Sequence, residues 1–140
     1  MKRIFILVAA ILLVFGYVQA KENIIDIYLV APHKYNAPMR RLPIVSAPKE
    51  VSGVVIFRVD RQATQEEVEN NKYLVEYFLD DQLIYKTNGE NEVKPKSPSF
   101  DLNLDTTQYS DGQHKLTVNF WDKTGPSAIG MENLFIKNNK

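Results

Sequence analysis

The stretch His114–Trp121, with the sequence HKLTVNFW, decides the fold. Leu116, Val118 and Phe120 occupy every second position, and polar residues fill the positions between them. A β-strand sends alternate side chains to opposite faces, whereas a helix would need apolar residues three or four positions apart. The pattern therefore predicts a strand with one face buried in a core.

The same alternation recurs along the chain. Turn-forming residues separate the segments roughly every ten residues, which is typical of short antiparallel strands. About seven to eight such segments predict an all-β protein, an antiparallel β-sandwich in which two sheets pack face to face. The expected strands are Ile24–Val30, Val54–Val59, Tyr73–Leu79, Leu83–Lys86, Phe100–Asp105, His114–Trp121 and Ala128–Lys137.

Three stretches lack this alternation. Residues 31–50 carry four prolines, which remove backbone donors, so we expect a crossing loop or an irregular edge strand with Leu42–Ser46 as its most ordered part. Residues 61–71 and 87–98 are polar and are expected to be loops, the first with room for one helical turn. No segment shows a convincing helical repeat, which agrees with an all-β chain.

The N-terminus has the three parts of a secretory signal peptide. Lys2 and Arg3 supply positive charge, residues 4–14 are apolar throughout, and Ala20 ends a short stretch suited to cleavage. The apolar run is too short for a comfortable membrane span, although a retained anchor is the alternative. We predict a signal peptide over 1–20, an N-terminal strand and proline-rich segment over 21–50, and the sandwich over 51–137. The protein is then exported, to the periplasm or beyond, with no membrane span after cleavage.

Composition excludes several functions. The chain has 140 residues, enough for one domain, with 17 Lys and Arg against 17 Asp and Glu. A nucleic-acid partner is not expected, because it would need a concentrated basic surface. The chain has no cysteine, which excludes disulfides, a thiol nucleophile and cysteine-ligated metals. We expect no cofactor.

Four stretches between Val51 and Ile136 form a recognisable series of motifs. They are Val51-Ser52-Gly53, Val75–Ile84 (VEYFLDDQLI), Leu104–Val118 (LDTTQYSDGQHKLTV) and Trp121–Gly125 (WDKTG). This series resembles bacterial immunoglobulin-like domains appended to secreted enzymes and surface proteins. The resemblance implies an immunoglobulin-like sandwich with Greek-key topology, a spacer, adhesive or carbohydrate-associated role, and no shared catalytic residues. The chain departs from the family where Asp80-Asp81 replaces the usual Asp-Gly, and where Gly125-Pro126 replaces Gly-Asn.

The residues that could carry chemistry do not favour an enzyme. His114 lies on the core-facing side of its strand and is expected to bond a loop carbonyl, while His33 is expected to be a solvated loop residue. No Gly-x-Ser-x-Gly motif is present. Aspartates gather at both ends of the expected sandwich without the dense spacing of a calcium loop, so we expect turn formers and no metal site. They are Asp60 and Asp122 at one end, and Asp80, Asp81, Asp105 and Asp111 at the other.

An outward-facing apolar strip is the candidate binding surface. If Phe120 faces the core, then Trp121 faces outward, and the same parity places Leu74 and Phe78 outward on a strand expected to be its neighbour. Loops carrying Arg61 and Lys123 would add contacts. An exposed strip of this kind marks a docking surface, unless the N-terminal strand or the long polar loop lies across it.

Three functions remain open at this point. The main hypothesis is an exported non-catalytic module with a structural or protein-binding role, whose partner is an envelope or extracellular protein. The second is a carbohydrate-binding accessory domain, in which aromatic faces stack on a polysaccharide. In the third, residues 23–30 complete the sheet of a neighbouring copy, so that the protein assembles by strand exchange.

Overall fold

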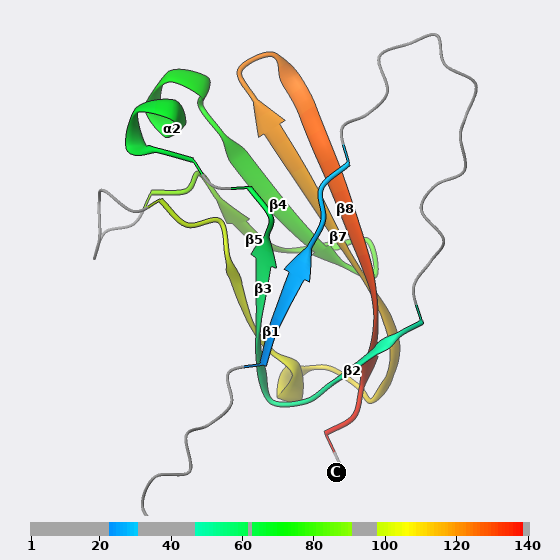
Figure 1. Ribbon diagram of the computed structural model, residues 1–140. Helices are drawn as coiled ribbons and strands as arrows, with labels where there is room; N and C mark the ends of the chain where they lie inside the picture. Colours follow the sequence, from blue (N-terminus) through cyan, green and yellow to red (C-terminus); the bar gives the residue numbers. More distant parts are fainter. Residues whose placement is uncertain (1–22, 31–46, 62, 91–97, 139–140) are drawn as a thin grey trace, which may run out of the picture.

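The computed structural model describes residues 23–30, 47–61, 63–90 and 98–138, which form two facing sheets (Figure 1). The prediction of an all-β sandwich is therefore confirmed. The three-stranded sheet has the order β1 (Asn23–Ile27), β3 (Val54–Val59) and β6 (Leu102–Asp105). The five-stranded sheet has the order β2 (Lys49–Val51), β8 (Gly125–Ile136), β7 (Gly112–Asp122), β4 (Leu74–Leu79) and β5 (Gln82–Thr87).

The chain passes repeatedly between the sheets, as a Greek key requires. The connections from β3 to β4, from β5 to β6 and from β6 to β7 each change sheet, and β7 lies between β4 and β8. Pairing is antiparallel except at two edges, where β1 runs parallel to β3 and β2 runs parallel to β8. These two pairs are not joined by hairpins, so no tight turn imposes the antiparallel direction that the sequence pattern predicted throughout.

The core lies between the sheets and follows the predicted alternation. Val55, Tyr77 and Leu116 are completely buried, and Leu102 is 4% exposed. The Tyr77 hydroxyl donates to the Phe100 carbonyl at 2.6 Å, which joins β4 to the segment that enters the opposite sheet. Burial raises the pKa of this tyrosine, so its hydroxyl remains a donor.

The N-terminal strand is part of the sandwich. Ile27 is completely buried, and the Ile27 carbonyl accepts from the Asp60 amide at 3.1 Å. A Cβ atom at Gly130 would lie 2.6 Å from Ile27 Cγ2, so the missing side chain makes room for β1 against β8. The sandwich therefore extends N-terminally beyond the predicted start at residue 51.

A short helix replaces the loop predicted for residues 61–71. Helix α2 (Gln65–Asn71) starts with a capping box in which Thr64 Oγ1 accepts from the Glu67 amide and Glu67 Oε2 accepts from the Thr64 amide. Val68 is buried and attaches the helix to the core, and Lys72 ends it in a left-handed conformation. A second short element, η1 (Thr106–Gln108), connects β6 to the loop before β7.

Several predictions concern residues outside the described ranges. These residues belong to the predicted signal peptide over 1–20, His33, the predicted ordered stretch Leu42–Ser46 and most of the predicted loop over 87–98. Among the residues that the structure does describe, no helix has the length and apolar character needed to cross a membrane.

Candidate functional site

The three predicted strip residues face outward from the five-stranded sheet. Leu74 of β4 is paired with Trp121 of β7, and Phe78 lies further along β4 on the same face. All three are half-buried. The Trp121 indole Nε1 donates to Glu76 Oε2 at 3.0 Å, so the ring is fixed along the sheet. The predicted orientation is confirmed, but the strip is less exposed than a free aromatic platform would be.

Neighbouring strands extend this strip into an apolar row across the sheet. Strand pairing places Leu83 beside Phe78, Phe78 beside Thr117, and Thr117 beside Met131. Leu83 is 48% exposed and Met131 is 45% exposed. We call Leu83, Phe78, Thr117 and Met131, together with the flanking Leu74, Trp121 and Ile129, the outer apolar face.

The β5 and β8 residues of the outer apolar face were not predicted. Residues 128–136 carry apolar side chains on both faces of the strand, because outward Ile129 and Met131 alternate with inward Ala128 and Leu134. The pattern therefore could not say which side of β8 is buried. Glu132 also faces inward, at the edge of the core, where it pairs with Lys49 Nζ at 3.1 Å. A charged residue at an inward position made the buried side of β8 harder to predict.

The N-terminal strand does not cover the outer apolar face. Strand β1 belongs to the opposite sheet, and Val30 meets Ile129 edge to edge through two backbone hydrogen bonds. After β5, the Ser99 amide donates to the Gly89 carbonyl, so the two described ends of the long loop lie together.

Arg61 and Lys123, whose loops were predicted to add contacts with a partner, both have contacts within the chain. The Arg61 guanidinium lies over the core-facing rings of Phe120 and Tyr73, with Cζ 4.6 Å and 5.3 Å from their centroids. Its Nη1 atom donates to Ser127 Oγ at 3.3 Å. Ser127 lies at a bulge in β8, between Pro126, which pairs with Trp121, and Ala128, which pairs with Phe120. Arg61 therefore closes one end of the core. Lys123 is exposed in the turn after β7, and its amide donates to the Asn71 carbonyl.

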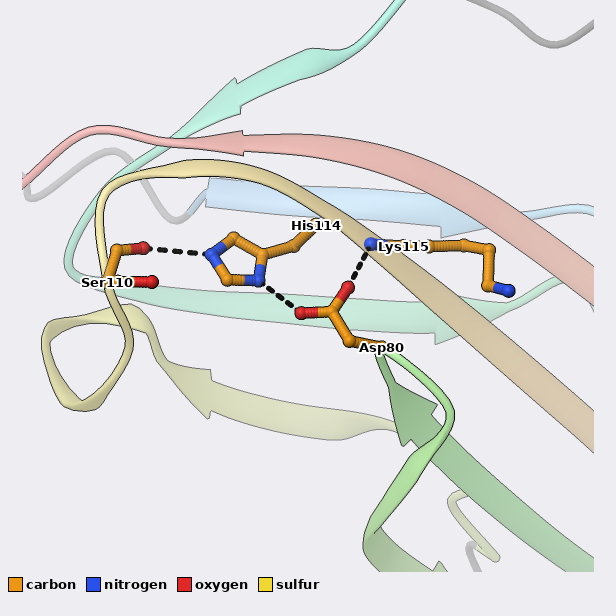
Figure 2. A network of polar contacts seen from close by, with 4 residues as sticks. All are labelled: Asp80, Ser110, His114 and Lys115. Atoms are coloured by element: carbon orange, nitrogen blue, oxygen red, sulfur yellow. Dashed lines mark hydrogen bonds and ion pairs between the residues drawn. The ribbon is translucent and has the colours of Figure 1, made fainter.

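A polar network surrounds His114 at the other end of β7 (Figure 2). His114 Nδ1 lies 2.6 Å from Asp80 Oδ2, and His114 Nε2 lies 2.8 Å from the Ser110 carbonyl oxygen. The Lys115 amide donates to Asp80 Oδ1 at 2.9 Å. The predicted bond to a loop carbonyl is confirmed. Because Nε2 faces an oxygen that can only accept, this histidine has no nitrogen directed at a nucleophile.

The aspartates at the two ends of the sandwich all have partners within the chain. They accept from backbone amides, cap short elements, or pair with a lysine, which are the roles expected of turn formers. Within the described ranges, no group of three or more His, Asp or Glu side chains is placed to hold a metal ion. The contacts are Asp60 with Leu29, Asp80 with Lys115 and His114, Asp81 with Lys115, Asp105 with Thr107, Asp111 with Asn138, and Asp122 with Thr124.

A polar hollow of about 860 Å³ lies where β3 meets the start of α2. Its wall includes Arg58, whose Nε lies 3.8 Å from Asp101 Oδ2. Burial raises the pKa of Asp101, and the Arg58 charge opposes that rise. Asp26, in the same wall, adds to the rise in the pKa of Asp101.

Comparisons with known proteins do not assign a family. No family model and no curated protein matches the chain. A solved structure of a lytic polysaccharide monooxygenase from Jonesia denitrificans is similar, with a TM-score of 0.41 and 17% sequence identity. The likeness covers 65% of this chain and 58% of that chain, and at this TM-score it carries no argument about function.

Proposed function

We propose that the protein is an exported, non-catalytic immunoglobulin-like module that binds an envelope or extracellular protein through the outer apolar face. The observation that carries the proposal is the row from Leu83 through Phe78 and Thr117 to Met131 across four neighbouring strands, with exposed side chains at both ends and half-buried ones between them. Monomeric proteins seldom expose contiguous apolar surface of this kind unless it contacts a partner. The Greek-key sandwich and the motifs of the sequence support the immunoglobulin-like assignment.

The composition of the face favours a protein over a sugar as the partner. Leu83, Met131 and Ile129 are its most exposed large side chains, and all three are aliphatic. Sugar sites present flat aromatic rings, whereas here the Trp121 ring is half-buried and its N–H is held by Glu76. Aliphatic side chains on a flat sheet suit a second protein surface. Strand exchange has less support, since residues 23–27 pair with β3 of the same chain.

Site-specific photo-crosslinking in the producing cell tests this proposal. A photoreactive residue at Met131 should give one discrete adduct with another protein, identified by mass spectrometry. Val54, which is 62% exposed on β3 of the other sheet, provides a matched control position. The proposal requires that Leu83→Glu abolish the Met131 adduct. Equal adducts at both positions, or glycan-array binding that Leu83→Glu abolishes, would contradict it.

A further inference from the structure

The hydrogen bonds of His114 define its charge state. A neutral imidazole has one N–H donor and one nitrogen that only accepts, whereas the imidazolium ion donates from both nitrogens. In this structure each ring nitrogen faces an acceptor, the Asp80 carboxylate at 2.6 Å and the Ser110 carbonyl at 2.8 Å. A neutral ring would leave one nitrogen lone pair directed at an oxygen lone pair. The geometry is therefore satisfied only by the protonated ring.

We propose that Asp80, Ser110 and His114 form a protonation-controlled clasp, which ties the β4–β5 turn to the loop before β7 when the ring is charged and releases them as pH rises. Asp80 comes from the β4–β5 turn, whereas Ser110 and His114 lie on the continuous stretch that enters β7, as Figure 2 shows. The histidine side chain is 10% exposed and the Asp80 side chain is 51% exposed. Loss of the proton would leave a neutral ring that can donate to only one of its two acceptors, so one of the two bonds that make the clasp would be lost.

The charged groups around the clasp are otherwise paired with one another. Asp81 in the same turn lies 2.9 Å from Lys115 Nζ, and Asp111 accepts from the Asn138 amide. On the other side, β8 places Leu134 beside His114, and β2 places Lys49 beside Leu134. Lys49 is held by Glu132 of β8, and Glu50 of β2 lies 3.6 Å from Lys137. Asp80 is therefore the carboxylate that contacts the ring.

The direction of the titration follows from the environment. Burial would lower the pKa of His114, but the bonds to Asp80 and Ser110 outweigh burial and hold this pKa above its ordinary 6.5. Burial would raise the pKa of Asp80, but the Lys115 amide and His114 hold this pKa below its ordinary 3.8. A raised histidine pKa adds stability that is complete below pH 6.5 and is lost as pH rises through the folded value. A lowered aspartate pKa adds stability that is complete above pH 3.8 and is lost as pH falls through the folded value.

The clasp also holds a strained turn in place. Asp80 and Asp81 have φ angles of 49° and 66°, a left-handed conformation that residues other than glycine adopt at a cost. The Asp80 amide donates to the Lys115 carbonyl at 2.9 Å while Asp80 Oδ1 accepts from the Lys115 amide. We therefore expect opening of the clasp to weaken these two hydrogen bonds before it weakens the other hydrogen bonds of the sheet.

Nuclear magnetic resonance of the ¹⁵N-labelled protein, with the N-terminus that the producing cell leaves, tests the proposal. The imidazole nitrogens of His114 should titrate above the ordinary histidine pKa of 6.5. Below the midpoint, both His114 nitrogens should carry protons. Hydrogen exchange supplies the second readout. After correction for base catalysis, protection of the Lys115 amide should fall as pH rises from 6.5 to the His114 midpoint, by at most about tenfold per pH unit, and should level off above that midpoint.

Asp80→Asn is the matched variant, because it keeps the side-chain shape and removes the charge. It should lower the His114 midpoint toward the ordinary 6.5 and abolish the pH dependence at Lys115. If this variant does not fold, the wild-type titration decides the question. A wild-type His114 midpoint at or below 6.5, a single protonated nitrogen at low pH, or Lys115 protection that does not change with pH would each overturn the proposal.

Discussion

The two ends of the sandwich are each closed by one cationic side chain at the rim of the core, but the two cations differ in kind. Arg61 lies over the rings of Phe120 and Tyr73, and its guanidinium stays charged at every pH at which proteins fold. His114 lies between a carboxylate and a carbonyl, and its charge changes near neutrality. One strand, β7, connects both ends. The comparison indicates that one end is fixed while the other responds to pH.

The largest expected effect comes from removing the aromatic platform at the Arg61 end. Phe120→Ala deletes a completely buried ring that contacts Tyr73 and Phe100 at centroid distances of 5.1 Å and 5.3 Å. We expect the free energy of unfolding in urea to fall by about 3–5 kcal/mol. Phe135→Ala, at an exposed ring on the outer side of β8, is the control and should cost far less. Equal losses for the two variants would mean that the ring at 120 is not part of the core.

A smaller effect is expected from removing the cation itself. Arg61→Met keeps an apolar stem over the rings but loses the charge and the bond to Ser127. The unfolding free energy should fall by about 1–2 kcal/mol, as for a partly desolvated cation–π contact. Arg61→Lys should retain part of this energy. A loss that grows or shrinks between pH 6 and pH 9 would contradict the view that this end is insensitive to pH.

The capping box of α2, beside the Arg61 end, should contribute about as much to the free energy of unfolding as the Arg61 charge does. Thr64→Ala removes the oxygen that accepts from the Glu67 amide at 3.2 Å, so the first turn of α2 loses a cap. The expected loss in unfolding free energy is about 1 kcal/mol. Thr64→Ser keeps the hydroxyl and is the control. If circular dichroism and urea unfolding show no difference between the two variants, the cap does not stabilise the helix.

The smallest effect, and a gain, is expected at the His114 end. Asp81→Gly relieves the left-handed strain at φ 66° but removes the exposed pair with Lys115. The net result should be a rise of about 0.5 kcal/mol in unfolding free energy. Asp81→Asn, which tolerates the conformation and removes the charge, separates the two contributions. A marked loss in Asp81→Gly would show that the salt bridge outweighs the strain.

The sequence predicted those parts of the fold in which local pattern and burial agree. Alternation in β3, β4, β6 and β7 assigned the buried faces, since each strand has one side that is apolar at successive positions, whereas polar or charged residues interrupt the other side. Strand direction at the two edges was not predictable, because parallel pairing depends on long connections rather than on local pattern. Helix α2 was predicted only as one possible turn within a loop, although Thr64-Gln65-Glu66-Glu67 carries the capping-box spacing, since its seven residues are too few for a helical repeat.

The candidate sites divide in the same way. Parity predicted the outward positions of Leu74, Phe78 and Trp121 correctly. The contacts of Arg61 with Ser127 and two aromatic rings could not be predicted, because residues far apart in the sequence meet there only in the folded chain. Asp80 was recognised as a turn residue, but its bond to His114 joins residues 34 positions apart and has no local signal.

Unfolding free energies in urea at pH 6 and pH 9, measured side by side for the wild type, Arg61→Met and His114→Gln, test the comparison of the two ends most directly. The wild type and Arg61→Met should lose the same stability on going from pH 6 to pH 9, because the clasp opens in both. His114→Gln should lose clearly less, because it has no ring to deprotonate. Equal losses in all three proteins would contradict the account.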